Sequence, residues 1–372
     1  MKITIFMGPW FPVPAVEGGS VHRFWHGLAE NFSSKGHQVK ILSKIWVNQP
    51  SYQVISGVEY IRRRGFMQSN FLLFNIVKDL IYSFSFSKIL PVADIIIVND
   101  FWLPFFAGKS AGKLILNVNR MPKGQIKWYP ERAKFIAASF SIKKAIEAQF
   151  PKAVNRVLVI PNPIDTEIFY PEFIGKKYNN KIILYTGRIH PEKGLSLLIR
   201  SFAILSKKYA GITLRIVGPF EEKQGGAGLQ YFNSLKNMCK GLSVEFIGPE
   251  FELNKLAQIY RSSNIFCYPS ISEKGEAFGV SALEAMASGL VTIVSSLDCF
   301  KDFIEDRKTG YIFDHRSKDS AIELSKTLEL ALYDSDENKA IIENAVKKVS
   351  SFSYDKVADS YLAYFNNLLI TK

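Results

Sequence analysis

The stretch GEAFGVSALEAMASGLVTIVSS, residues 275–296, joins an alanine-rich helical segment to an apolar run that is typical of a buried strand. One acid, Glu276, precedes the helical segment, and a second acid, Glu284, lies inside it between Leu283 and Ala285. A helix that leads directly into a buried strand is typical of sheets covered by helices. The stretch therefore indicates an α/β fold, and its two acids require an explanation.

The same alternation of short apolar runs and helix-period segments fills the chain and starts twice. Strand-like runs of the first series are residues 3–7, 39–42, 94–98, 113–118, 135–138 and 157–160. Those of the second series are residues 182–186, 213–217, 243–247, 265–268, 291–294 and 311–313. Strands that alternate with helices form parallel sheets, so the restart predicts two doubly wound domains.

The domain boundaries follow from the restart. We expect an N-terminal domain of residues 1–165, a linker of residues 166–180 and a C-terminal domain of residues 181–350. A last helical segment, residues 351–372, has no strand after it, and we expect it to pack back on the N-terminal domain. Ligands of doubly wound sheets bind beyond the carboxyl ends of the strands. Two such sheets that face each other predict one interdomain cleft.

Charge is distributed unevenly along the 372 residues, whose formal net charge is +13. Residues 1–170 carry 21 Lys and Arg against 10 Asp and Glu, whereas the other 202 residues carry 26 against 24. A basic half predicts an anionic partner, such as a phosphorylated substrate or a membrane surface. Because no zinc-finger spacing or RNA-binding aromatic signature accompanies the charge, we expect no nucleic-acid partner.

The cysteines and the first residues of the sequence indicate the cellular compartment of the protein. Cys239, Cys267 and Cys299 are far apart and lack metal-ligand spacing, which is typical of reduced thiols in a cytoplasmic protein. The first residues lack the long apolar segment and cleavage site of a signal peptide. No run reaches the roughly 18 uncharged apolar residues of a spanning helix. We therefore expect a cytoplasmic protein.

The spacing of the two acids fits a bound nucleotide. If the helix starts near Phe278 and Gly279, its first N–H groups lack partners and its positive end favours a phosphate. At about 1.5 Å per residue, Glu284 lies roughly 7–8 Å further along, about as far as a ribose lies from its diphosphate. We therefore predict that Glu284 accepts hydrogen bonds from ribose hydroxyls and that Glu276 faces a sugar.

The residues between the acids complete this interpretation. We expect Phe278, Gly279 and Val280 to border the phosphates, with the glycine allowing close approach of the backbone. In isolation, two acids at this spacing are ordinarily a loop acid and a half-exposed helix acid. Two further stretches favour the nucleotide.

The first of them is YTGRIHPEKGLSLLIRSF, residues 185–202, which leads from a strand into a helix. It leaves Arg188 and Lys193 on the connecting loop. Two cations there can hold a diphosphate and stabilise it as a leaving group. Taken alone, the pair fits ordinary solvated charges as well.

The second lies at the end of the first strand, where Gly18 and Gly19 precede a helix and the run Gly36-His37-Gln38-Val39. The pair is not a G-x-G-x-x-G sequence, so a dinucleotide site has little support. Taken alone, the glycines fit a plain turn equally well.

Together the three stretches resemble the retaining family-4 glycosyltransferases with the GT-B fold. The E-x7-E signature of that family is matched by Glu276, Phe278, Gly279, Glu284 and Gly289, with Leu290 where proline is usual. The family also has a G-R-x-x-x-x-K-G arrangement and a P-x-x-G-G loop, and the similarity spans residues 3 to about 365. The resemblance implies two Rossmann-like domains that face an interdomain cleft.

The resemblance also implies an activity. Members transfer a sugar from a nucleotide-diphosphate donor, such as a UDP- or GDP-sugar, to a hydroxyl with retention of the anomeric configuration. Arg188 and Lys193 correspond to donor-phosphate ligands, and Gly18 and Gly19 to the loop that borders the donor. No cofactor and no metal are expected, since the chain has no D-x-D motif and the cations with the helix dipole can replace a metal ion.

One part of the family pattern differs. Many members have histidine or a His-Asp pair at strand ends of the N-terminal domain, where this chain has Asn99-Asp100 and Asn119-Arg120. We take Asp100 and Asn119 as candidates for contact with the reacting sugar. His22 and the other histidines of the N-terminal half are interpreted as structural.

Two alternatives remain open from the sequence. An epimerase or hydrolase of the same fold would use the same donor site without an acceptor. A non-catalytic sugar-nucleotide-binding protein is expected to have lost part of that site, whereas Arg188, Lys193, Glu276 and Glu284 are all present.

The segment NFLLFNIVKDLIYSFSFSKIL, residues 70–90, suggests where the acceptor is met. On a helix, Leu73, Val77 and Phe84 belong to one apolar stripe, which fits an ordinary core face. Phe71 and Phe74 lie off that stripe, and Arg62-Arg63-Arg64 precede it. Basic residues beside surplus aromatic residues are typical of an anionic membrane surface. We therefore expect a glycan or lipid-linked acceptor and peripheral association with the inner face of the cell membrane.

Overall fold

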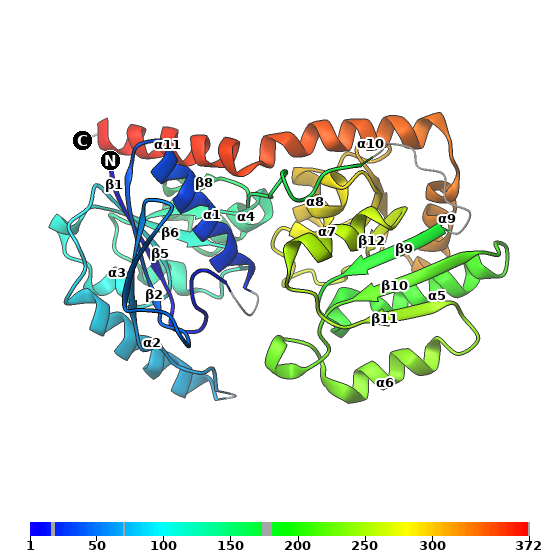
Figure 1. The fold of residues 1–372 in the computed structure, drawn as a ribbon, viewed down its shortest axis with the longest axis horizontal. Coiled ribbons are helices and arrows are strands. Elements are labelled where there is room, and N and C mark those ends of the chain that lie inside the picture. Colours follow the sequence, from blue (N-terminus) through cyan, green and yellow to red (C-terminus); the bar gives the residue numbers. More distant parts are fainter. Residues whose placement is uncertain (16–18, 70, 173–180, 371–372) are drawn as a thin grey trace. The chain divides into compact units, whose positions relative to one another are not determined.

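The computed structural model describes residues 1–15, 19–69, 71–172 and 181–370. They form two compact units. Unit 1 comprises Met1–Pro163 with Tyr354–Lys372, and unit 2 comprises Ile164–Ser353 (Figure 1).

Unit 1 is built on a sheet of eight strands in the order β3-β4-β2-β1-β5-β6-β7-β8. The strands are β1 (Lys2–Met7), β2 (Gln38–Lys44), β3 (Tyr52–Ile55), β4 (Val58–Arg63), β5 (Ile95–Asn99), β6 (Lys113–Val118), β7 (Lys134–Ala137) and β8 (Val157–Val159). Neighbouring strands are parallel except for β3 and β4, which form an antiparallel hairpin. The sequence analysis did not predict this hairpin.

The helices of unit 1 cover that sheet. They are α1 (Ser20–Ser34), α2 (Leu72–Ser87), α3 (Leu103–Phe106), α4 (Phe140–Gln149) and α11 (Tyr354–Ile370), with short 3-10 turns η1 (Lys109–Ala111), η2 (Gln125–Trp128) and η3 (Pro151–Arg156). The last helix, α11, packs on α1 through Tyr361 against Trp25, with ring centroids 5.4 Å apart, and through Phe365 against Phe32, at 5.9 Å. The end of the chain therefore belongs to the core of unit 1.

Unit 2 has a sheet of six parallel strands in the order β11-β10-β9-β12-β13-β14. The strands are β9 (Lys181–Thr186), β10 (Ile212–Val217), β11 (Val244–Ile247), β12 (Ile265–Tyr268), β13 (Val291–Ser295) and β14 (Tyr311–Phe313). The helices are α5 (Leu195–Ser206), α6 (Gly228–Met238), α7 (Leu253–Arg261), α8 (Val280–Ala287), α9 (Ser320–Leu332) and α10 (Asp336–Val349), with turns η4 (Pro191–Lys193), η5 (Glu222–Gln224), η6 (Asp298–Asp302) and η7 (Ser350–Phe352).

Two helix-covered sheets, one parallel and one parallel except for the β3–β4 hairpin, confirm the predicted doubly wound α/β fold class. In unit 2 the chain adds β10 and β11 on one side of β9 and then places β12 on the other side. The strand order therefore reverses between β9 and β12, and ligands of such sheets bind beyond the carboxyl ends at the reversal. Unit 1 has the same reversal between β1 and β5.

Candidate functional site

Two loops meet at the reversal point of unit 2, one after β9 and one after β12. The β9 loop begins at Gly187, whose carbonyl oxygen lies only 1.9 Å from where a Cβ on Gly218 would be. It ends at Gly194, which has a positive φ of 72° and would place a Cβ 2.0 Å from the Pro269 carbonyl oxygen. Only glycine fits at these two contacts, so the backbone at the carboxyl ends of β9, β10 and β12 is closely packed.

Arg188 lies on the β9 loop with its side chain 44% exposed. Its Nη2 lies 2.8 Å from Glu192 Oε1, and its Nη1 donates to the Gly225 carbonyl oxygen at 2.9 Å. The guanidinium group is thus oriented by two partners and remains partly open to solvent. A fixed, accessible guanidinium group is suited to a phosphate.

Lys193 and Glu276 form a buried ion pair. The Lys193 Nζ lies 2.7 Å from Glu276 Oε2, and the two side chains are 7% and 8% exposed. Lys193 also lies 5.3 Å from the centroid of the Tyr268 ring at the end of β12. The structure therefore brings together two residues that the sequence analysis assigned to different parts of a ligand. Buried charges are costly unless paired, so each holds the other in place.

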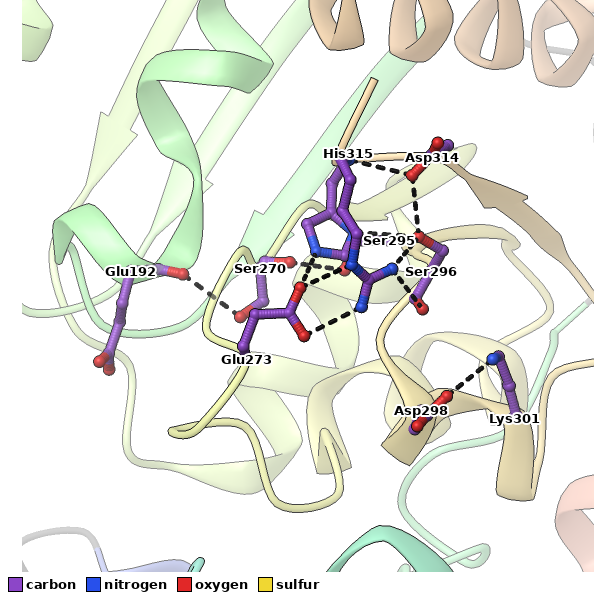
Figure 2. A network of polar contacts seen from close by, with 10 residues as sticks. Glu192, Ser270, Glu273, Ser295, Ser296, Asp298, Lys301, Asp314 and His315 are labelled. Atoms are coloured by element: carbon purple, nitrogen blue, oxygen red, sulfur yellow. Dashed lines mark hydrogen bonds and ion pairs between the residues drawn. The ribbon is translucent and has the colours of Figure 1, made fainter. Parts of the chain in front are cut away.

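Backbone contacts tie the two loops together around Glu192. Its carbonyl oxygen accepts a hydrogen bond from the Ile271 N–H at 2.9 Å. It also accepts one from the Ser270 hydroxyl at 3.3 Å (Figure 2). A Cβ on Gly275 would lie 2.1 Å from the Ser272 Oγ. The segment that carries Glu276 is thus fixed against the loop that carries Arg188 and Lys193.

Helix α8 begins where the sequence predicts a phosphate-binding turn. Gly279 precedes it with a φ of 83°, and a Cβ there would lie 2.5 Å from the Phe300 ring. The first N–H groups of the helix have no acceptor within the helix, which favours an anion. Phe278 is buried against Phe303, with ring centroids 5.3 Å apart, and Val280 is half-buried. The Phe278 side chain therefore anchors this turn to the core.

Glu284 is buried inside unit 2. It is 4% exposed and accepts a hydrogen bond from the Tyr260 hydroxyl at 3.0 Å. The same hydroxyl is hydrogen-bonded to Thr186 at the end of β9, and burial and the charge of Glu284 raise the pKa of Tyr260 well above its ordinary value. Tyr260 therefore stays protonated and fixes the carboxylate. Nothing in the motif spacing points to this tyrosine, and the sequence analysis missed it.

A second polar network lies at the carboxyl ends of β13 and β14 (Figure 2). Glu273 contacts His315 Nε2 at 3.0 Å and Arg316 Nε at 2.8 Å, which lowers the pKa of Glu273. His315 Nδ1 in turn lies 3.1 Å from the Ser296 hydroxyl. Because Glu273 is three residues before Glu276, this network holds the loop that carries Glu276. The sequence analysis missed these residues too.

The glycine pair of unit 1 is described in part. Gly18 lies outside the described residues. Gly19 precedes α1 with a φ of 95°, and a Cβ on it would lie 3.2 Å from His22 Nδ1. The left-handed backbone conformation explains a glycine at this position.

Asp100 and Asn119 have different surroundings. Asp100 accepts hydrogen bonds from the Ser83 hydroxyl and from the Leu103 N–H, the latter at 3.0 Å, and burial raises its pKa to about 6. Its carboxyl group is therefore engaged in the interior of unit 1. Asn119, in contrast, has a buried Oδ1 with no hydrogen-bond partner among the described residues.

His22, like Asn119, has buried polar atoms without a hydrogen-bond partner in the described part of the chain. Both of its ring nitrogens are buried without a partner among the described residues, and burial together with the charge of Arg120 lowers its pKa to about 4. One helical turn further along α1, Trp25 Nε1 donates to Asn99 Oδ1 at 2.8 Å, and Asn117 Nδ2 donates to the same oxygen at 3.1 Å.

From these contacts we infer that His22 and Asn119 lie at the same edge of the sheet. His22 is one turn nearer than Trp25 to the start of α1, and Asn119 is two residues beyond Asn117 along the chain. Both steps lead from the Asn99 contact to the carboxyl edge of the sheet. Unsatisfied buried polar atoms require an explanation, and a ligand is one. The sequence analysis interpreted His22 as structural.

Across the described ranges there is no group of three or more His, Cys, Asp or Glu side chains that could hold a metal ion. Among those residues no helix is both long and apolar enough to cross a membrane.

Comparisons with known proteins concern the family and the fold. Residues 167–348 match the family model described as "Glycosyl transferases group 1". The uncharacterized glycosyltransferase MJ1607 of Methanocaldococcus jannaschii is 26% identical over an alignment of 407 positions that covers 96% of each chain. Sucrose-phosphate synthase from Thermosynechococcus elongatus has a similar structure, with a TM-score of 0.80 at 19% identity over 100% of both chains. HepE of Anabaena, solved in complex with UDP-glucose, has a TM-score of 0.73 at 15% identity and covers 99% of this chain and 100% of its own.

The two units thus have the architecture of GT-B proteins, with a reversal-point site in unit 2. Residues 167–348, just under half of the chain, match the group 1 glycosyltransferase model, and the chain is similar over its length to a glycosyltransferase. The similarity agrees with the predicted resemblance, and the GT-B fold is confirmed.

Proposed function

We propose that this glycosyltransferase moves a hexosyl group from a UDP- or GDP-sugar to a hydroxyl of a glycan or lipid-linked acceptor and retains the anomeric configuration. The observation that carries the proposal is the buried Lys193–Glu276 pair beside Arg188 at the reversal point of unit 2. The UDP-glucose complex of HepE, which has the same fold, supports a nucleotide-sugar donor. Synthesis of a cell-surface polysaccharide or glycolipid is the role we propose for the reaction.

The donor diphosphate binds between Arg188 and the start of α8. Arg188 donates from its accessible guanidinium group, and the first N–H groups of α8 donate from the other side. Lys193 adds positive charge next to the bond that breaks, where negative charge develops on the departing diphosphate. These groups supply the charge that a metal ion would otherwise supply, so the proposed reaction is metal-independent.

Glu284 and Tyr260 select the nucleoside. A carboxylate that is already fixed by one hydrogen bond loses little freedom when it accepts others from ribose hydroxyls. Glu276 precedes the start of α8 in the sequence, whereas Glu284 lies within the helix. In this proposal Glu276 contacts the transferred sugar. Its ion pair with Lys193 keeps the carboxylate oriented.

Retention follows from attack on the face that the leaving group occupies. The bond between the anomeric carbon and the diphosphate oxygen breaks, and the acceptor oxygen bonds to the same face of the sugar. The proton of the acceptor hydroxyl passes to the departing diphosphate, so the protein supplies no covalent nucleophile. We propose that His22 and Asn119 of unit 1 hold sugar hydroxyls, because their buried polar atoms lack other partners among the described residues.

An epimerase or hydrolase, or a non-catalytic binder, is the competing function. The donor site alone does not separate these classes, whereas product analysis does. Purified protein is incubated with UDP- and GDP-sugars with and without a panel of glycan and lipid-linked acceptors, and products are followed by NMR. Transfer with a retained anomeric configuration supports the proposal. Free sugar or an epimer that forms equally well without acceptor contradicts it.

The matched test of the site uses Arg188→Ala, with Arg307→Ala as control. Arg307 is an exposed arginine of unit 2 whose Nη1 lies 3.5 Å from an exposed Glu337 carboxylate. We expect Arg188→Ala to lower kcat/KM by about 10²–10³-fold, the scale of one lost anion contact, and the control to change it little. Equal effects of both changes would contradict the assigned donor site.

A further inference from the structure

Helix α2 of unit 1 has its apolar side facing outward. Its exposed side chains, with those just before it, are large and apolar and range from 40% exposed at Ile76 to 74% at Leu72. They are Phe71, Leu72, Leu73, Phe74, Ile76, Val77, Ile81 and Phe84. The stripe that fits an ordinary core face in the sequence is therefore not the core face of this helix.

The inner side of α2 carries the polar groups. Asp79 is turned toward Asp100, and burial and the charge of Asp100 raise the pKa of Asp79 to about 9. Ser83 donates a hydrogen bond to Asp100, and Tyr82 and Phe86 pack on Phe6 with ring centroids 5.8 Å and 5.3 Å away. A surface helix of a globular protein ordinarily buries its apolar side. This inversion indicates that the outer face of α2 has a partner of its own.

The apolar surface continues onto α3 and the turn η2. Trp102 Nε1 donates to the Ile76 carbonyl oxygen at 3.1 Å, and Phe106 contacts Phe84 with ring centroids 5.6 Å apart. Phe105 is 40% exposed and Trp128 is 62% exposed. We call these two residues and the eight exposed residues of α2 and its start the α2–α3 surface. Contiguous exposed apolar patches of this kind mark interaction sites.

Most of the exposed charges in the segments around the α2–α3 surface are positive. Arg64, Lys88, Lys109 and Lys127 are exposed, and Lys88 Nζ lies 4.8 Å from the centroid of the exposed Phe84 ring. Between residues 60 and 132 the acids of the sequence are Asp79, Asp94, Asp100 and Glu131. Asp79 and Asp100 contact each other inside unit 1, and Glu131 is exposed next to Arg132 in the sequence.

Asp94 precedes β5 and accepts a hydrogen bond from the Lys2 N–H at 2.7 Å, at the amino end of the strands. Arg62, which the sequence analysis grouped with the membrane-facing bases, is buried. Its guanidinium group donates to the Val13 carbonyl oxygen at 3.3 Å and to the Pro50 carbonyl oxygen at 3.2 Å.

We propose that the α2–α3 surface binds an anionic lipid bilayer, with α2 lying in the plane of the membrane interface. The helix has 16 residues and is therefore about 24 Å long, enough to lay several apolar side chains among the acyl chains. The exposed bases then contact lipid phosphates. A second copy of the chain is a poorer partner, since the same bases would face one another across a twofold interface.

This binding does not depend on the proposed sugar transfer, but it would bring a lipid-linked acceptor to unit 1. The test is co-sedimentation of the full chain with vesicles of phosphatidylcholine alone or mixed with phosphatidylglycerol, at low and high salt. Neither donor nor acceptor is present, so failure of this proposal is distinguishable from failure of the proposed function. We expect binding to the anionic vesicles at low salt and weaker binding at high salt.

Two variants distinguish binding through the α2–α3 surface from nonspecific binding by exposed apolar residues. Leu72→Ser/Phe74→Ser removes two exposed side chains of the α2–α3 surface. The control, Val47→Ser/Val54→Ser, removes two apolar side chains that are equally exposed elsewhere on unit 1. We expect the first to lower the partition coefficient at least about tenfold and the control to leave it unchanged.

The charge contribution is tested by Lys88→Gln. We expect it to weaken binding to anionic vesicles about fivefold and to leave any binding to neutral vesicles unchanged. Protein that stays in the supernatant with anionic vesicles at low salt overturns the proposal. Equal losses in the α2 variant and its control also overturn it. So does a stable dimer in sedimentation velocity that Leu72→Ser/Phe74→Ser dissociates, because the partner is then a second copy.

Discussion

Removal of one charge from the Lys193–Glu276 pair tests most directly whether the site is built as described. The two charges lie 2.7 Å apart with side chains 7% and 8% exposed, so the loss of one leaves the other buried and unpaired. Such a loss costs about 3–5 kcal/mol, whereas replacement of both partners by neutral groups of similar volume is close to neutral. We therefore expect Lys193→Met and Glu276→Gln each to lower the free energy of unfolding of unit 2 by about 3–5 kcal/mol. The free energy of unfolding of the double variant should lie within about 1 kcal/mol of that of the unchanged protein.

The assay is urea unfolding of the full chain, followed by far-ultraviolet circular dichroism. Tryptophan fluorescence is unsuitable, because the five tryptophans, at positions 10, 25, 46, 102 and 128, all lie in unit 1. Arg307→Met is the control, since its pair with Glu337 spans 3.5 Å with side chains 57% and 51% exposed. An exposed pair of this kind contributes at most about 1 kcal/mol.

Activity separates the structural role of the pair from its proposed role in catalysis. If Lys193 and Glu276 act on the donor, the double variant recovers stability but not kcat/KM. Two results would refute the reasoning. Single changes that each cost less than about 1 kcal/mol would show that the charges are not desolvated. A double variant that regains transfer activity would show that the pair only supports the fold.

Three further predictions concern other parts of the chain. Tyr260→Phe removes the hydrogen bond that the Tyr260 hydroxyl donates to the Glu284 carboxylate. It should weaken the binding of UDP or GDP, measured by calorimetry, by about 1.5–3 kcal/mol. Unchanged affinity would contradict the assignment of Glu284 to the ribose. Because burial and a neighbouring carboxylate raise the pKa of Asp79 to about 9, the folded state retains a proton that the unfolded chain releases above about pH 4. Stability should therefore fall as the pH rises from about 4 to about 9, and Asp79→Asn should flatten that fall in urea unfolding; an unchanged slope would argue against the buried acid. EDTA should leave sugar transfer largely intact, and a complete loss that Mg²⁺ or Mn²⁺ restores would overturn the metal-independent reaction.

Local features of the fold were predictable because they depend on neighbours in sequence. The apolar runs and helix periods predicted two doubly wound sheets, and the glycine at 279 predicted the start of α8. Glu192 lies four residues after Arg188, but a spacing of four predicts a contact only on a helix, and Arg188 lies on a loop. The Arg188–Glu192 contact of 2.8 Å therefore depends on how the loop folds.

The side that α2 turns to the core was not predictable from its pattern. Its apolar stripe fits a core face, and the sequence carries more apolar residues than one face needs. The structure turns Asp79 and Ser83 inward because Asp100, at the end of β5, accepts from Ser83 and contacts Asp79. A helical pattern defines two faces, and only the groups packed against the helix decide which face is inside.

The sequence by itself determined the α/β class, the loop that carries Arg188 and Lys193, and the turn before α8. Only the tertiary structure decided that Lys193 pairs with Glu276 and that Glu284 pairs with Tyr260. The members of the first pair are 83 positions apart in sequence, and they meet because β12 lies beside β9 although β10 and β11 precede it in the chain. Strand order depends on how the whole sheet is packed, and a motif spacing carries no information about which strand becomes the neighbour.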